Sequence, residues 1–118
     1  MDNRRTNARY PVAVAAELEV DGEAYDGETR DISMGGVSVL IEAPLQEGES
    51  VDVTLVLIED GVESAVEDAV TTRAEVRWIA PTDDGACLAG LRFGTLDTDI
   101  SLRLRRFLTA VVEQGTTA

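Results

Sequence analysis

Apolar and polar residues alternate along most of the chain, in short segments separated by turn residues. Alternation with a period of two predicts half-buried β-strands, because successive side chains of a strand point to opposite faces. The clearest case is residues 12–20, where every second residue is apolar and Glu17 and Glu19 fall on the other face. The sequence therefore predicts a strand here, and Asp21-Gly22 predicts a turn after it.

Five further segments are expected to be strands. They span residues 23–32, 37–41, 51–58, 70–78 and 87–93. Segment 23–32 has a poor alternating pattern and is assigned mainly because the neighbouring strands require a partner. The alternation in segment 70–78 places Trp78 on the same face as Val76. The acidic segment 59–69 is expected to be a solvated connection, since its carboxylates do not have calcium-loop spacing, and no metal site is expected. Six short strands predict an all-β, six-stranded antiparallel barrel, in which closure leaves no unpaired sheet edge.

The period of the pattern changes near the C-terminus. Apolar residues from Ile100 onward recur at helical spacing, which predicts an amphipathic α-helix over residues 98–114 that packs on the barrel or fills one end. Thr98 or Asp99 is expected to cap its start, and Gly115 to lie just past its end. Its three arginines, at positions 103, 105 and 106, could reach a ligand or a partner, but a solvated face is the favoured interpretation.

The length of 118 residues corresponds to one domain. We expect an N-terminal arm over residues 1–11, the barrel over 12–94 and then the helix. No apolar run reaches eighteen residues and no secretory leader is recognisable, so a cytoplasmic protein without a membrane span is expected. The single Cys87 cannot form an internal disulfide, which agrees with a reducing compartment.

Charge is the most unusual bulk property. The chain has 23 acidic and 10 basic residues, a formal net charge of -13, and every basic residue is arginine. This balance argues against DNA, RNA or an anionic membrane as a partner, because such partners require a basic face. Three of the arginines lie in the first ten residues beside one acid, so the arm is a local cationic region suited to a small anion.

Residues 30–41 carry the most distinctive motif. Asp31 and Ser33 precede two adjacent glycines, Gly35 and Gly36, and an alternating apolar segment follows. Glycines permit unusual backbone torsions and close approach of another group, and short polar side chains bond nearby amides or an external ligand. By itself the motif fits either an ordinary hairpin turn or a ligand site.

A second motif favours the ligand site. Arg5 and Arg9 form Arg-x-x-x-Arg, and Asp31, Ser33 and Gly36 form Asp/Asn-x-Ser-x-x-Gly. In this order and separation the pair resembles the two signatures of the PilZ domain, a bacterial receptor module for cyclic di-GMP, and the resemblance extends from the arm to the C-terminal helix. It implies a six-stranded barrel and the following ligand-binding residues: Arg4, Arg5, Arg9, Asp31, Ser33 and Gly36.

The resemblance also implies a role for each motif. Guanidinium groups fork onto phosphate oxygens and onto guanine O6 and N7, so Arg5 and Arg9 are expected to clamp the dinucleotide, with Asp31 and Ser33 bonding guanine. Gly36 is expected to keep the turn open. In PilZ domains an arginine directly before the first signature tends to accompany an intercalated pair of ligands, and Arg4 implies such a pair here. A simple basic tail is the alternative for the arm.

The expected function is therefore a non-enzymatic receptor. A chain with no histidine and one cysteine lacks the usual nucleophile and base pairs. The arm is expected to be flexible when empty and to become ordered around cyclic di-GMP, which presents a changed surface to an unidentified downstream protein. The alternative is a PilZ-like interaction module that has lost nucleotide binding. No cofactor is expected.

Overall fold

The computed structural model describes residues 9–57 and 69–115, with side chains as far as residue 111. The expectations for Arg4, Arg5 and the rest of segment 1–8, and for nearly all of the acidic connection, lie outside the described residues. The elements, in chain order, are β1 (Tyr10–Pro11), β2 (Ala15–Val20), β3 (Glu23–Ile32), β4 (Gly36–Ile41), β5 (Ser50–Val56), β6 (Ala69–Pro81), β7 (Cys87–Phe93) and α1 (Thr98–Gly115).

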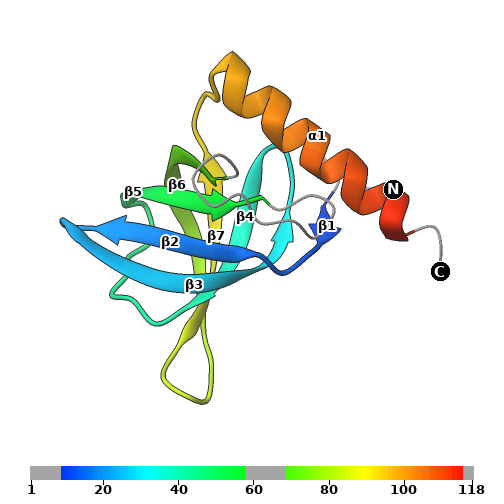
Figure 1. Cartoon of the computed structure of the whole chain (residues 1–118). Coiled ribbons are helices and arrows are strands. Elements are labelled where there is room, and N and C mark those ends of the chain that lie inside the picture. The colour runs from blue at the N-terminus through cyan, green and yellow to red at the C-terminus, as the bar shows by residue number, and fades with distance from the viewer. Residues whose placement is uncertain (1–8, 58–68, 116–118) are drawn as a thin grey trace, which may run out of the picture.

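The strands form one antiparallel sheet in the order β1-β3-β2-β5-β6-β7-β4, and β4 also pairs with β3. This last pairing closes the six strands β2 to β7 into a barrel, as the alternating pattern predicted (Figure 1). β1 is an additional two-residue strand on β3, formed by the last two residues of the predicted arm. Closure matters for the site because it places the β3–β4 turn beside β7.

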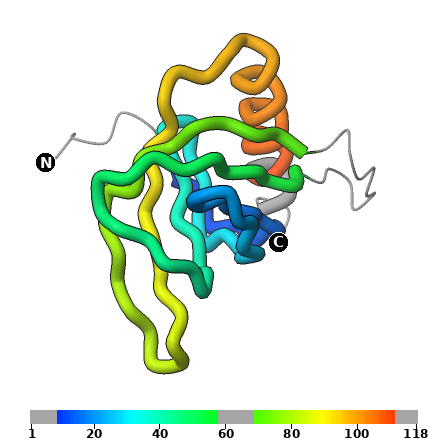
Figure 2. The backbone as a smooth tube through the Cα atoms, turned by 90° about the vertical axis from the view of Figure 1, so that its left-hand side faces the viewer, coloured from blue at the N-terminus to red at the C-terminus, as the bar shows by residue number. Residues whose placement is uncertain are grey.

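The inward-facing side chains of all six strands form a single apolar core. Leu18, Val39, Val53 and Val76, from four of the strands, are at most 1% exposed. Helix α1 adds Leu104, Phe107 and Leu108 to this core, which confirms that its apolar stripe packs against the barrel. Figures 1 and 2, from two directions, both show α1 at the end of the barrel opposite the β6–β7 turn.

The helix cap differs from the prediction. The Oδ1 atom of Asp97 accepts a hydrogen bond from the backbone N–H of Ile100 at 2.8 Å, so Asp97 is the N-cap and neither Thr98 nor Asp99 is. A carboxylate at this position accepts one of the backbone N–H groups that the first helical turn leaves without an intrahelical partner. The sequence offers three adjacent capping residues, and periodicity alone does not choose among them.

The face of Trp78 also differs from the prediction. The pairing of β6 with β7 shifts between Val76 and Trp78, which leaves Arg77 as an extra residue in β6. Such a bulge reverses the in-and-out alternation that follows it. Trp78 therefore lies on the outer face, opposite Gly90, and Ile79 takes the core-facing position.

A second irregularity separates β1 from β2. Pro11 pairs with Asp31 and Ala15 with Glu28, so three residues, 12–14, face only two on β3. The buried Thr29 hydroxyl fills this interruption, donating to the carbonyl oxygen of Val12 at 2.6 Å and accepting from the amide N–H of Val14 at 2.9 Å. The strand predicted from residue 12 consequently begins at Ala15. β1, on the other side of the interruption, still pairs with the end of β3.

Candidate functional site at the β3–β4 turn

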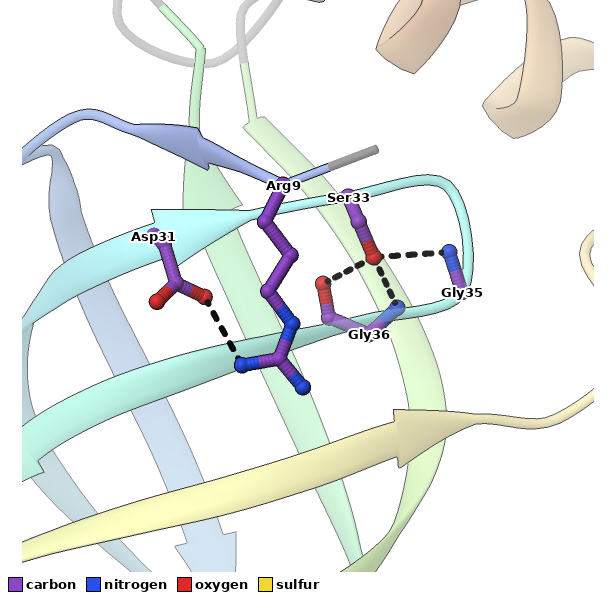
Figure 3. A network of polar contacts seen from close by, with 5 residues as sticks. All are labelled: Arg9, Asp31, Ser33, Gly35 and Gly36. Atoms are coloured by element: carbon purple, nitrogen blue, oxygen red, sulfur yellow. Dashed lines mark hydrogen bonds and ion pairs between the residues drawn. The ribbon is translucent and has the colours of Figure 1, made fainter. Parts of the chain in front are cut away.

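The turn between β3 and β4 is organised by one side chain. The Oγ atom of Ser33 accepts hydrogen bonds from the N–H groups of Gly35 and Gly36, both at 3.1 Å, and donates to the Gly36 carbonyl oxygen at 3.3 Å (Figure 3). The Ser33 N–H also donates to that carbonyl oxygen at 2.8 Å. With Ser33 only 7% exposed, its hydroxyl is committed to holding the turn closed.

Gly36 is required where β4 meets β7. A Cβ atom at this position would collide with the carbonyl oxygen of Leu91 and lie 3.3 Å from the Cα atom of Arg92. Both neighbouring atoms belong to the backbone and have little room to shift. The glycine of the second signature therefore has a packing function in the barrel whether or not a ligand is bound.

Arg9 and Asp31 lie together on the outer surface next to this turn. Pairing of Tyr10 with Ile32 and of Pro11 with Asp31 places β1 along the end of β3, and Arg9 directly precedes it. The Arg9 Nη1 atom is 3.9 Å from the Asp31 Oδ1 atom, and the two side chains are 41% and 28% exposed. Figure 3 shows the Arg9 side chain reaching across β3, with its guanidinium beside the Asp31 carboxylate. An exposed pair at this distance contributes little stability, so both groups are easily available to a ligand.

A row of outward-facing positions continues from Asp31 across four strands. Asp31 pairs with Ser38 on β4, Ser38 with Gly90 on β7, and Gly90 with Trp78 on β6. Directly paired residues of adjacent antiparallel strands project from the same face of the sheet. Two bulges set this row, one after Thr29 in β3 and one after Val76 in β6, and the alternating pattern in the sequence reveals neither.

Ser38 and Trp78 are the members of this row that the sequence did not indicate. The Trp78 indole lies over Gly90 so closely that a Cβ atom on Gly90 would collide with the ring. Ser38 is 3% exposed, and its Oγ atom has no hydrogen-bond partner in the described part of the chain. The only signals in the sequence were a lone tryptophan and a serine two residues after the signature glycine.

A separate cleft of about 460 Å³ lies among β5, β6 and β7, with Arg73 and Arg92 on its walls. It contains none of the predicted site residues, although Arg92 is the β7 neighbour of Gly36. The Arg73 Nη1 atom is 3.1 Å from the Asp52 Oδ1 atom, so one of the two cations is already engaged. The turn and the outer face beside it remain the more specific arrangement.

Two further features bear on the kind of site present. Among residues 9–57 and 69–115, no group of three or more histidine, cysteine, aspartate or glutamate side chains is arranged to hold a metal ion. In the same residues no helix has the length and apolar character that crossing a membrane requires.

The fold and the turn together define a small helix-capped barrel module with a polar outer site. The sequence matches the model of the PilZ domain over residues 3–110, and the chain therefore belongs to the PilZ domain family. This confirms the resemblance and the predicted fold class. No curated protein sequence matches the chain at a significant level.

Solved structures of PilZ proteins share the fold at low sequence identity. The PilZ domain of YcgR from Escherichia coli with c-di-GMP has a TM-score of 0.74 and 16% identity, over 96% of this chain and 95% of that one. The inhibitor of motility MotI/DgrA of Bacillus subtilis has a TM-score of 0.78 and 19% identity over 99% of this chain. The MrkH–c-di-GMP complex of K. pneumonia has a TM-score of 0.75 and 18% identity over 98%. This chain spans about half of MotI and MrkH, 54% of each.

Proposed function

We propose that this domain is a non-enzymatic receptor for cyclic di-GMP. The observation that carries the proposal is the position of Arg9, which is held by β1 beside Asp31 and next to a turn already closed by Ser33. Membership of the PilZ family and the likeness to YcgR and MrkH, both solved with c-di-GMP, support the same ligand.

The chemistry of the site suits a guanine dinucleotide. The guanidinium of Arg9 can leave its weak contact with Asp31 for a phosphate or for the O6 and N7 atoms of guanine, which accept two parallel hydrogen bonds. The Asp31 carboxylate, then uncovered, accepts hydrogen bonds from guanine N–H groups. Arg5 is the second clamp of the proposed site. Ser33, with its hydroxyl engaged, and Gly36 shape the turn that the ligand meets.

The arm provides the proposed signal. Binding orders the part of the arm that precedes Arg9 around the dinucleotide, and the covered surface becomes the one that a downstream protein recognises in the cytoplasm. Arg4 would place a further cation over a second, intercalated ligand molecule, giving two per chain. Burial raises the pKa of the Cys87 thiol and so disfavours its nucleophilic thiolate form, which agrees with a binding module and not an enzyme.

Titration calorimetry with cyclic di-GMP tests the proposal. Each charge-assisted contact is worth roughly 1.5 to 3 kcal/mol, so Arg5→Ala and Arg9→Ala should each weaken binding about ten- to a hundred-fold. Arg105→Ala removes the same charge from the exposed surface of α1 and serves as the matched control, with affinity expected to be unchanged. Equal affinities for all three variants would refute this site.

The wild-type titration decides between the two candidate functions. A titration in which the heat of binding saturates as cyclic di-GMP is added supports the receptor function. No binding at millimolar ligand would favour the alternative, a PilZ-like module that acts only through protein contacts.

A further inference from the structure

The Ser38 hydroxyl is an unusual group for a folded domain. It lies on β4, two residues after the signature glycine, and its side chain is almost completely shielded from solvent at 3% exposure. No other group among the described residues hydrogen-bonds to its Oγ atom. Buried hydroxyls nearly always have a partner, since burial removes the bonds to water. An unpaired one needs an explanation.

The position of Ser38 connects it to the proposed ligand site. Its β3 neighbour is Asp31, the carboxylate beside Arg9, and its β7 neighbour is Gly90. All three face outward, so the hydroxyl belongs to the surface that carries the ligand site and not to the apolar core. The distance between directly paired side chains, about 5 Å, is short enough for one planar base to contact both Asp31 and Ser38.

Trp78 is the large side chain on the outer face nearest to this hydroxyl along the row of paired positions, because Gly90 pairs with both Ser38 and Trp78. Its indole occupies the space that a side chain on residue 90 would fill, immediately next to Ser38. The ring is only half-buried and rests on a glycine backbone, so no side chain at position 90 blocks its movement. The indole can therefore turn away from this position without a clash from residue 90.

We propose that Ser38 is a further ligand-binding residue and that Trp78 is its movable cover. A purine base entering beside Asp31 displaces or slides along the indole, and the Ser38 hydroxyl then hydrogen-bonds a nitrogen or oxygen on the edge of the base. The indole remains against the base as a stacking surface. This inference rests on the proposed function, and it adds a contact from β4 and a conformational change on β6.

The test compares Ser38→Ala with the wild type in two measurements, thermal unfolding of the free protein and calorimetric titration with cyclic di-GMP. Alanine removes the hydroxyl with little change in volume. Because that hydroxyl has no partner in the free protein, the melting temperature should stay the same or rise. The affinity should fall about five- to ten-fold, because the ligand loses a hydrogen bond. Ser50→Ala, an exposed serine on β5, is the matched control, and both quantities should stay at wild-type values.

Trp78 provides an independent readout, since it is the only tryptophan in the chain. Saturating ligand should change the intensity or emission maximum of its fluorescence, with a titration midpoint that matches the calorimetric Kd. Unchanged fluorescence on binding would overturn the role of Trp78 as a cover.

The remaining outcomes separate this inference from the receptor function itself. If the wild type and Ser38→Ala bind cyclic di-GMP equally well, the role of Ser38 is overturned and the receptor function is left intact. Ser38→Ala that loses stability and affinity together indicates a structural hydroxyl and also overturns it. Wild-type protein that does not bind removes the receptor function, and this inference with it.

Discussion

Substitution of Thr29 by valine would test how the barrel holds its first strand. Valine has nearly the same shape as threonine, so the apolar packing is retained and only the hydroxyl is lost. That hydroxyl serves two backbone groups, the Val12 carbonyl at 2.6 Å and the Val14 N–H at 2.9 Å. Thr29 itself is 1% exposed, which limits access of replacement water from its side.

The expected loss follows from those two groups. A backbone group left without a partner costs about 1 to 3 kcal/mol, and the lower half of this range applies because both bonds are only partly buried. Thr29→Val should therefore lower the free energy of unfolding by about 2 to 4 kcal/mol, or roughly 8 to 16 °C in Tm. Urea unfolding followed by circular dichroism measures this loss, and the slope m should not change.

Thr54→Val is the matched control for this experiment. Its hydroxyl bonds only the Thr71 hydroxyl, at 2.8 Å on an exposed face, and water can replace that bond. The control should lose less than about 0.5 kcal/mol. If Thr29→Val loses no more than Thr54→Val, the hydroxyl does not hold the interruption between β1 and β2 together, and the account of how β1 is positioned is wrong.

Three other changes test separate parts of the molecule. Asp97→Ala should destabilise the protein by about 1 kcal/mol through loss of the α1 cap, measured by thermal unfolding, whereas Asp99→Ala should have little effect. Deletion of residues 1–9 removes only a weak, exposed ion pair from the described contacts, so the Tm of the free protein should change by a few degrees at most; the stabilisation by cyclic di-GMP should disappear, and an unfolded product would show that the arm is structural. Arg4→Leu should reduce the stoichiometry from about two ligands per chain to about one; a wild-type ratio of one, well above the dissociation constant, would remove this role for Arg4.

The sequence predicted the barrel well and its irregularities poorly. Alternation identifies a strand because burial on one face repeats every second residue, and the run from Cys87 to Phe93 was predicted with its observed limits. The same rule failed at Trp78, because a bulge inserts one residue and reverses the faces after it. A bulge depends on how two strands pair, which is not visible in either strand alone.

The candidate site was likewise predicted only in part from the sequence. The two signatures identified Arg9 and Asp31, which the barrel brings together from positions 22 residues apart in the chain. Ser38 and Trp78 were not predicted because their place beside Asp31 depends on the register of four strands. Their relevance appears only when paired positions on adjacent strands are compared in three dimensions.

The close contact at Gly36 affects how genetic tests of this domain can be interpreted. Any side chain there meets the backbone of β7, so a Gly36 variant that loses binding could simply have a distorted barrel. Loss of binding after substitution of Ser33 has the same ambiguity, since its hydroxyl closes the turn. Of the second signature, Asp31 makes only a weak ion pair with Arg9 and does not hold the turn, so its substitution is the most direct test of the proposed recognition. A mutational scan scored by signalling output alone would therefore overstate the number of ligand contacts that this signature makes.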